Sequence, residues 1–199
     1  MKKTFILLCA VLLILSACSS TNVKRVDAEK QIDLSGYWND TDVRIVCEAL
    51  INDCIRSQRV DQEIRANSRT PMVIVGRFRN ESDEHINTDI ISSTMEVTIF
   101  NSGKLDFVAG GDVREDLRAE RMDQQNNANA ETMARLRNET GADFMLTGAV
   151  RTIVDREANQ TVRTYFVTAE LTSIETNQRL WMGQNSEIKK LITRSRNSL

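Results

Sequence analysis

The sequence predicts an α+β fold: a single domain with one small, mostly antiparallel or mixed sheet packed by helices, in the order α-β-α-β-α-α-β-β-β. An apolar stripe of helical period over residues 40–57 indicates a first helix, and the apolar run Met72–Val75 indicates a buried strand. Apolar residues that alternate from Tyr165 to Leu171 indicate a longer strand. Without its first 17 residues the chain has 182 residues, enough for one domain and short for two.

The first helix should bury one face and carry charges on the other. Its apolar positions recur at helical spacing: Val43, Val46, Cys47, Leu50, Ile51 and Cys54. Asn39 or Thr41 could cap its amino end. Cys47 and Cys54 lie about 10.5 Å apart along a helix axis, farther than the roughly 7 Å between Cα atoms that a disulfide allows. We therefore expect two unbridged thiols that act as small apolar core groups.

The segment 85–100 fits two structures. Met95, Val97 and Ile99 alternate as in a strand, whereas helical spacing places apolar residues on two opposite faces. We favour a helix, because sixteen residues without a turn signal are long for a strand. A helix that is apolar on two sides should be largely buried or should meet a partner.

The remaining elements follow from turn signals and alternation. A capping-box pattern at Asp112 and Glu115 starts a charged helix, and Gly141 is a natural helix end. The expected elements are a strand from Met72 to Phe78, a short strand over 105–109, helices over 112–125 and 130–141, and strands over 144–150, around 165–171 and over 180–188.

The amino terminus reads as a targeting signal. Lys2 and Lys3 precede an apolar run over 5–15 that is too short to span a bilayer. Leu15-Ser16-Ala17-Cys18 resembles the lipobox of bacterial lipoproteins. That resemblance implies that residues 1–17 are a signal peptide and that Cys18 carries a diacylglyceryl group and an acylated amine, with fatty acids such as palmitate. Two or more acyl chains anchor a protein stably to a membrane.

Residues 18–37 should form the lipidated cysteine and a flexible tether, because they are polar and contain no proline. Residues 19–34 fully extended would span about 53–58 Å. The globular domain is expected over 38–192, followed by a tail over 193–199. Serine at positions 19 and 20, rather than aspartate after the cysteine, resembles sorting to the outer membrane in lipoproteins of double-membraned bacteria.

Charge and motif content bear on the class of function. The net charge of −2 becomes −4 once Lys2 and Lys3 leave with the signal, and an acidic chain argues against nucleic acid as a partner. The single histidine, His85, is interpreted as a polar residue at a helix start; a catalytic base or metal ligand is the alternative. No CxxC pair, G-x-S-x-G motif or Walker-type loop occurs. The sequence predicts no catalytic, cofactor or metal site, and hence no enzyme.

Several stretches resemble one known family when taken together in order. They are Leu34-Ser35-Gly36-Tyr37-Trp38-Asn39-Asp40, Val75-Gly76, Asn80-Glu81-Ser82, His85-Ile86-x-Thr88, Gly141-Ala142-Asp143-Phe144-Met145-Leu146-x-Gly148, Tyr165, Leu180-Trp181 and Lys189-Lys190. This set, behind a lipobox, is similar to the LpoB family of penicillin-binding protein activators. The resemblance covers roughly residues 34–190.

The resemblance implies a fold like the amino-terminal domain of TolB. It also implies an outer-membrane lipoprotein that faces the periplasm, binds a bifunctional penicillin-binding protein and stimulates peptidoglycan synthesis, and so affects the cell wall and cell shape. The best known members carry a long proline-rich tether, which this chain lacks. The resemblance therefore leaves open whether this chain reaches through the peptidoglycan as those members do.

We expect a non-enzymatic activator of a peptidoglycan synthase. The alternative is a structural or assembly lipoprotein that binds another envelope protein or the cell wall. Arg114, Arg118 and Arg121 of the charged helix are candidate partner contacts, with a solvated helix face as the competing interpretation. Trp38 and Trp181 could stack on sugar rings, or could serve the core or an interface.

Overall fold

The computed structural model describes residues 23–27, 30–129, 131, 134 and 139–194. The chain divides into two units, Met1–Gln31 and Ile32–Leu199, and the helices and strands below belong to the second. Within the described residues, no helix combines the length and apolar character needed to cross a bilayer.

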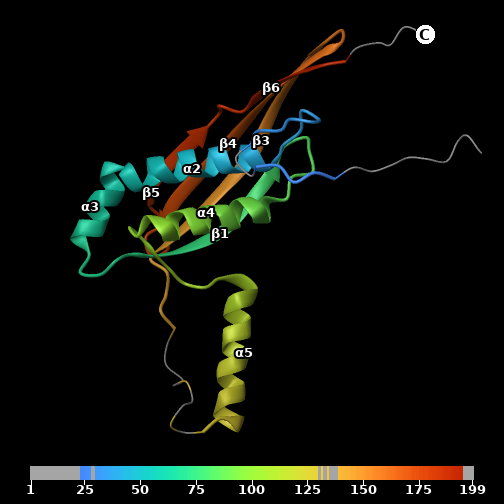
Figure 1. The fold of residues 1–199 in the computed structure, drawn as a ribbon. Coiled ribbons are helices and arrows are strands. Elements are labelled where there is room, and N and C mark those ends of the chain that lie inside the picture. The colour runs from blue at the N-terminus through green and yellow to red at the C-terminus, as the bar shows by residue number, and fades with distance from the viewer. Residues whose placement is uncertain (1–22, 28–29, 130, 132–133, 135–138, 195–199) are drawn as a thin grey trace, which may run out of the picture. The chain divides into compact units, whose positions relative to one another are not determined.

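In its described residues the second unit is an α+β domain with four helices and one open, six-stranded mixed sheet, which confirms the predicted fold class (Figure 1). In chain order the elements are α2 (Asp40–Arg56), α3 (Gln58–Ala66), β1 (Met72–Glu81), α4 (Thr88–Ser102), β2 (Asp106–Phe107), α5 (Gly111–Asn127), β3 (Phe144–Glu157), β4 (Gln160–Ser173), β5 (Arg179–Asn185) and β6 (Lys189–Thr193).

The strands run in the order β2-β1-β3-β4-β5, and β6 pairs with the amino-terminal part of β4. β1 pairs in parallel with β2 and β3, whereas the pairs of β4 with β3, β5 and β6 are antiparallel. The predicted mixed sheet is therefore confirmed. The β3–β4 hairpin extends beyond the part that β1 covers, since β1 pairs with β3 only as far as Arg151.

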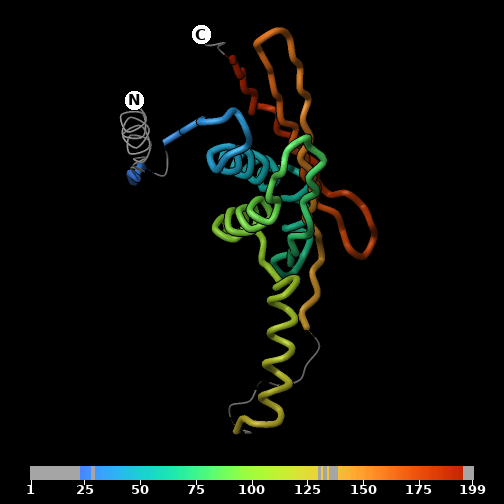
Figure 2. Tube along the Cα trace, turned by 90° about the vertical axis from the view of Figure 1, so that its right-hand side faces the viewer, coloured from blue at the N-terminus to red at the C-terminus, as the bar shows by residue number. Residues whose placement is uncertain are grey.

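Helices α2 and α4 lie on one side of the sheet, as Figure 2 shows in cyan and yellow-green. The core lies between them and the sheet, where alternate strand residues point toward the helices. The largest fully buried side chains are Tyr165, Phe78, Ile51, Ile91, Met95, Ile99, Leu146, Leu171, Val46, Val60, Val73 and Val150. The opposite side of the sheet carries many polar and charged side chains.

The first helix confirms its prediction closely. All six expected apolar positions of α2 are buried, and a reciprocal capping box between Asn39 and Asp42 starts it. Cys47 and Cys54 are free and buried, as expected. Burial raises the pKa of each thiol to about 12, with nearby Glu48 and Asp53 adding to the effect.

Helix α4 resolves the ambiguous segment in favour of a helix. Its inner face, Ile91, Met95 and Ile99, is buried. Its outer face leaves Ile90, Val97 and Phe100 more than half exposed. The helix is therefore buried on one side only, and a partner for its outer face stays a prediction.

Three local expectations were wrong or incomplete. No element was predicted for α3 or for β6, and the strand expected over 180–188 corresponds to β5, which ends earlier, at Asn185. The helix expected over 130–141 is absent at Glu131, Ala134 and residues 139–140, and the rest of that segment lies outside the described residues. Asparagine-rich sequence ends α5 at Asn127 instead.

Candidate functional site

The candidate functional residues from the sequence do not gather in one site. Cys18, the expected lipid site, lies outside the described residues. His85 is exposed on the loop two residues before Asn87, the N-cap of α4. The described residues contain no group of three or more metal-binding side chains.

The two tryptophans serve the fold. Trp181 is 7% exposed, and its indole nitrogen donates a hydrogen bond to Asp53 at 2.8 Å. Trp38 packs against Tyr165, with ring centroids 5.1 Å apart and tilted by 56°. The Trp181 ring therefore lies in the core, and the Trp38 ring packs against another aromatic ring of the domain.

The three candidate arginines of α5 converge on one carboxylate. Glu139 accepts hydrogen bonds from Arg118 and Arg121, and Arg114 lies 4.0 Å from it. The hydrogen bond from Arg118 is the main reason that the pKa of Glu139 lies below its ordinary value. Helix α5 buries none of its residues. This arrangement fits the solvated-face interpretation and gives no sign of a binding site.

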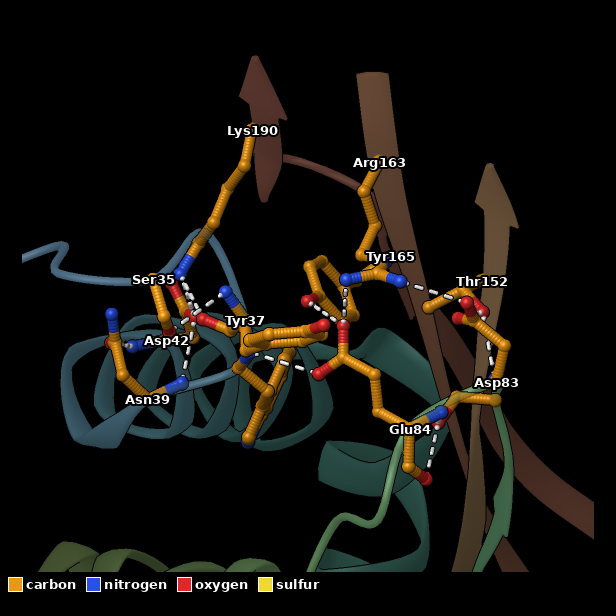
Figure 3. Close-up of polar contacts among 12 residues, drawn as sticks. Ser35, Tyr37, Asn39, Asp42, Asp83, Glu84, Thr152, Arg163, Tyr165 and Lys190 are labelled. Atoms are coloured by element: carbon orange, nitrogen blue, oxygen red, sulfur yellow. Dashed lines mark hydrogen bonds and ion pairs between the residues drawn. The ribbon is translucent and has the colours of Figure 1, made fainter. Parts of the chain in front are cut away.

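A polar cluster that the sequence analysis missed lies at the amino end of the domain, where residues 33–38 cross it (Figure 3). We call residues 33–38 the strap. At its centre the Arg163 guanidinium donates to Glu84 at 2.6 Å and to Asp83 at 2.7 Å. The side chains of Arg163 and Glu84 are each only 6% exposed, whereas that of Asp83 is 40% exposed.

Glu84 ties the strap to the sheet. One of its carboxylate oxygens also accepts from the Tyr165 hydroxyl at 2.6 Å, and the other accepts from the backbone N–H of Trp38 at 3.0 Å. Burial and this bond to Glu84 raise the pKa of Tyr165 above its ordinary range, so its hydroxyl stays protonated and donates. The Tyr37 ring lies 5.0 Å from the Arg163 guanidinium carbon, a cation–π geometry.

A second set of contacts fastens the strap through β6. Lys190 donates to Asp42 at 2.6 Å, to Asp33 at 2.9 Å and to the backbone carbonyl of Tyr37 at 2.7 Å. Burial raises the pKa of Asp42, although the bond from Lys190 opposes that shift. Gly36 has a φ of 72°, and a Cβ there would collide with Ile192, so glycine allows the close approach to β6.

The cluster is suited to holding the chain rather than to chemistry. Its buried carboxylates are already occupied by cationic or hydroxyl donors, which leaves no poised base or nucleophile. A pocket of about 560 Å³ adjoins it, lined by apolar groups such as Val43, Ile86 and Ile90 and also by Asp83, Glu84 and His85. The signal for the cluster was present in β4, because Arg163 shares the inward alternation of Tyr165 and Val167. A charge at an inward position requires a buried partner.

The sheet surface opposite α2 and α4 forms a second candidate site. We define this open face by the outward side chains of Arg77, Arg79, Met145, Thr147, Arg151, Thr168, Glu170, Arg179 and Met182, together with Glu81. A groove of about 470 Å³ runs over it. Glycine, alanine and threonine form much of its floor, and arginines stand at its sides.

Comparison with known proteins supplies the family. The family model described as peptidoglycan-synthase activator LpoB matches residues 42–186. A comparison with curated proteins gives no match.

Solved structures give weaker likenesses. The LpoB C-terminal domain from Salmonella enterica is 15% identical, with 77% of this chain and 99% of that chain covered and a TM-score of 0.38. The LpoB C-terminal domain from Escherichia coli is 14% identical at 77% and 99% coverage, with a TM-score of 0.39. Lipoprotein GNA1162 from Neisseria meningitidis is 19% identical at 64% and 88% coverage, with a TM-score of 0.41.

The identification therefore rests on the family model. Its match includes both buried partners at the centre of the polar cluster, Glu84 and Arg163, and every strand of the sheet except β6. Because this match spans more than half of the sequence, the chain belongs to the LpoB family of peptidoglycan-synthase activators.

Proposed function

We propose that this protein is an outer-membrane lipoprotein that binds a bifunctional penicillin-binding protein in the periplasm and raises its activity. The observation that carries the proposal is the match of the activator family model over residues 42–186. The domain acts by binding and not by catalysis: it shifts the synthase toward an active conformation for which it has the higher affinity.

The lipid anchor is part of the same proposal. The lipobox Leu15-Ser16-Ala17-Cys18 supports attachment of lipid to Cys18, and the serines that follow support the outer membrane. Replacement Cys18→Ala should abolish incorporation of labelled palmitate in growing cells. Label that persists in the Cys18→Ala protein would contradict the anchor while leaving the activator role to be judged separately.

The activator role is tested with the soluble chain from Leu34 onward and each bifunctional synthase of the same organism. Glycan polymerisation from lipid-linked precursor is measured with and without the domain. We expect binding to one synthase and an increased rate. A matched control is Leu50→Asp, which places a carboxylate at a core position that is 2% exposed and should abolish both folding and stimulation.

Two outcomes would contradict the proposal. Absence of binding and of any rate change with every synthase would favour a structural or assembly lipoprotein instead, and affinity purification from crosslinked cells would then name its partner. Stimulation that survived in the Leu50→Asp control would place the activity outside the folded domain. Turnover of peptidoglycan by the domain alone would identify an enzyme.

A further inference from the structure

The open face of the sheet differs in charge from the chain as a whole. It carries four guanidinium groups, from Arg77, Arg79, Arg151 and Arg179, against the carboxylates of Glu81 and Glu170. The complete chain, by contrast, has a net charge of −2. Positive charge is thus concentrated on one face of an acidic protein.

A β-bulge places two of these arginines on the open face. Val75 pairs with Leu146 and Phe78 with Gly148, so β1 contains one more residue than β3 between these two pairs. The extra residue turns Phe78 into the core and leaves Arg77 outward, where regular alternation from Val73 and Val75 would have pointed it inward. The irregular strand therefore presents a guanidinium that regular pairing would bury.

The guanidinium groups retain donors for a partner. Glu81 accepts from both Arg79 and Arg151, at 3.1 and 2.6 Å, and Glu170 accepts from Arg179 at 2.8 Å. Each arginine offers five N–H donors, so single pairings leave most of them available. Arg77 is exposed and has no ion pair within the described part of the chain.

The groove between the arginines has the make-up of a protein interface. Its floor is shallow because small residues such as Ala149 and Thr168 face each other across β3 and β4. Met182 is 65% exposed beside it and Met145 is 38% exposed. Arginine and methionine are enriched at protein interfaces. Among the described residues, no aromatic side chain lines the groove itself, although Phe166 shares the outward alternation of Thr168 and pairs with Arg151, which lines it.

We infer that the open face of the sheet binds an acidic protein surface of the synthase, with carboxylates of the partner meeting Arg77 and Arg179 on the two sides of the groove. This inference rests on the proposed function and adds the surface and its chemistry. Charge complementarity of this kind accelerates association and makes binding sensitive to salt.

The experiment measures binding of the lipid-free chain from Ser19 onward to the purified synthase that the wild-type protein stimulates, at low and at physiological ionic strength. The test variant is Arg77→Glu with Arg179→Glu, and the matched control is Arg59→Glu with Arg65→Glu, which makes the same charge change on exposed positions of α3. We expect at least about tenfold weaker binding for the test variant, mainly from slower association, and little change for the control.

A second variant tests whether the shape of the groove, and not only its charge, is needed for binding. Thr168→Trp fills the groove without changing the net charge, and should also weaken binding by about tenfold or more while thermal unfolding remains cooperative. Equal binding by the wild type, the charge variant and Thr168→Trp would overturn the inference and leave the activator role standing. Equal weakening by test and control variants would overturn it as well, because only general charge would then matter.

Two further outcomes are decisive. Failure of the wild type to bind any synthase would remove the proposed function and this inference together. Salt-sensitive binding of the wild type to purified cell wall, lost in the Arg77/Arg179 variant while synthase binding is retained, would assign the face to an anionic wall polymer and overturn the protein-docking inference.

Discussion

Replacing Glu84 and Asp83 separately tests whether the burial of an ion pair, rather than its charge alone, decides how much the pair stabilises the folded domain. Glu84 and Asp83 are neighbours, both accept from Arg163, and both lose one negative charge on replacement by alanine. They differ in exposure: the Glu84 side chain is 6% exposed and that of Asp83 is 40% exposed. The pair is therefore a nearly matched comparison of buried and solvated partners.

Replacement Glu84→Ala would remove the buried partner of the Arg163 guanidinium and leave it only the more exposed Asp83. It would also leave the Tyr165 hydroxyl and the Trp38 N–H without their hydrogen-bond acceptor. Removing one partner of a buried pair costs about 3–5 kcal/mol. Asp83→Ala leaves the Arg163–Glu84 contact in place, and an exposed pair contributes only about 0.2–1 kcal/mol. We therefore expect a loss of roughly 3 kcal/mol or more for the first variant and about 1 kcal/mol for the second.

The assay is urea unfolding at neutral pH, followed by tryptophan fluorescence and far-UV circular dichroism, with the free energy of unfolding taken from the midpoint and slope. Glu84→Gln provides a milder change if the alanine variant does not fold. The double variant Glu84→Met/Arg163→Met should cost less than Glu84→Ala, because it strands no charge. Equal losses for Glu84→Ala and Asp83→Ala would refute the reasoning.

Three further predictions concern single residues. Burial alone would raise the pKa of Asp143, but hydrogen bonds from Met72 and Arg69 outweigh it and lower the pKa below the ordinary 3.8. The stabilisation is therefore complete above 3.8 and is lost as the pH falls below that value through the lowered folded-state pKa, so the acid unfolding curves of wild type and Asp143→Asn should converge there. The thiols of Cys47 and Cys54 should resist a disulfide reagent at pH 8 until the protein unfolds, and rapid native labelling would contradict their burial. Gly148→Ala should destabilise the domain by about 2 kcal/mol or more in chemical denaturation, since its Cβ would collide with the Phe78 ring and a β4 carbonyl; a change under about 0.5 kcal/mol would show that the strands can separate there.

Elements with a strong apolar period were predictable from the sequence. Helix α2 shows this best, because its six apolar positions and its capping residues agree on one answer. Helix α3 was not predicted because only Val60 is buried and only Ile64, four residues later, also packs against the core, and two apolar positions make a weak pattern. Strand β6 was not predicted, because it exists by pairing with the amino-terminal part of β4, whereas β5 pairs with the later part of the same strand, and this tertiary pairing leaves no pattern in the sequence.

The polar cluster was not predictable either, because its residues are distant in the sequence and meet only in the folded sheet. Arg163 lies about 80 residues from Asp83 and Glu84 in the chain, and the pairing of β1 with β3 and of β3 with β4 brings that strand near the loop after β1. The alternation along β4 could have identified Arg163 as inward-facing. It could not have identified Asp83 and Glu84 as its partners. The arginines of the open face were likewise hidden, since a β-bulge, and not the period of β1, decides where Arg77 points.

The contacts of Lys190 have a consequence for a protein expected to be held by lipid at its amino end. Tension along the chain enters the domain at Asp33, where Lys190 joins the strap to β6 and to Asp42 at the start of α2. The load is thus first borne by ionic contacts at one end of the domain and not by the hydrogen bonds between central strands. Under pulling, we expect the strap to detach before the sheet, which would lengthen the tether while the folded domain stays intact.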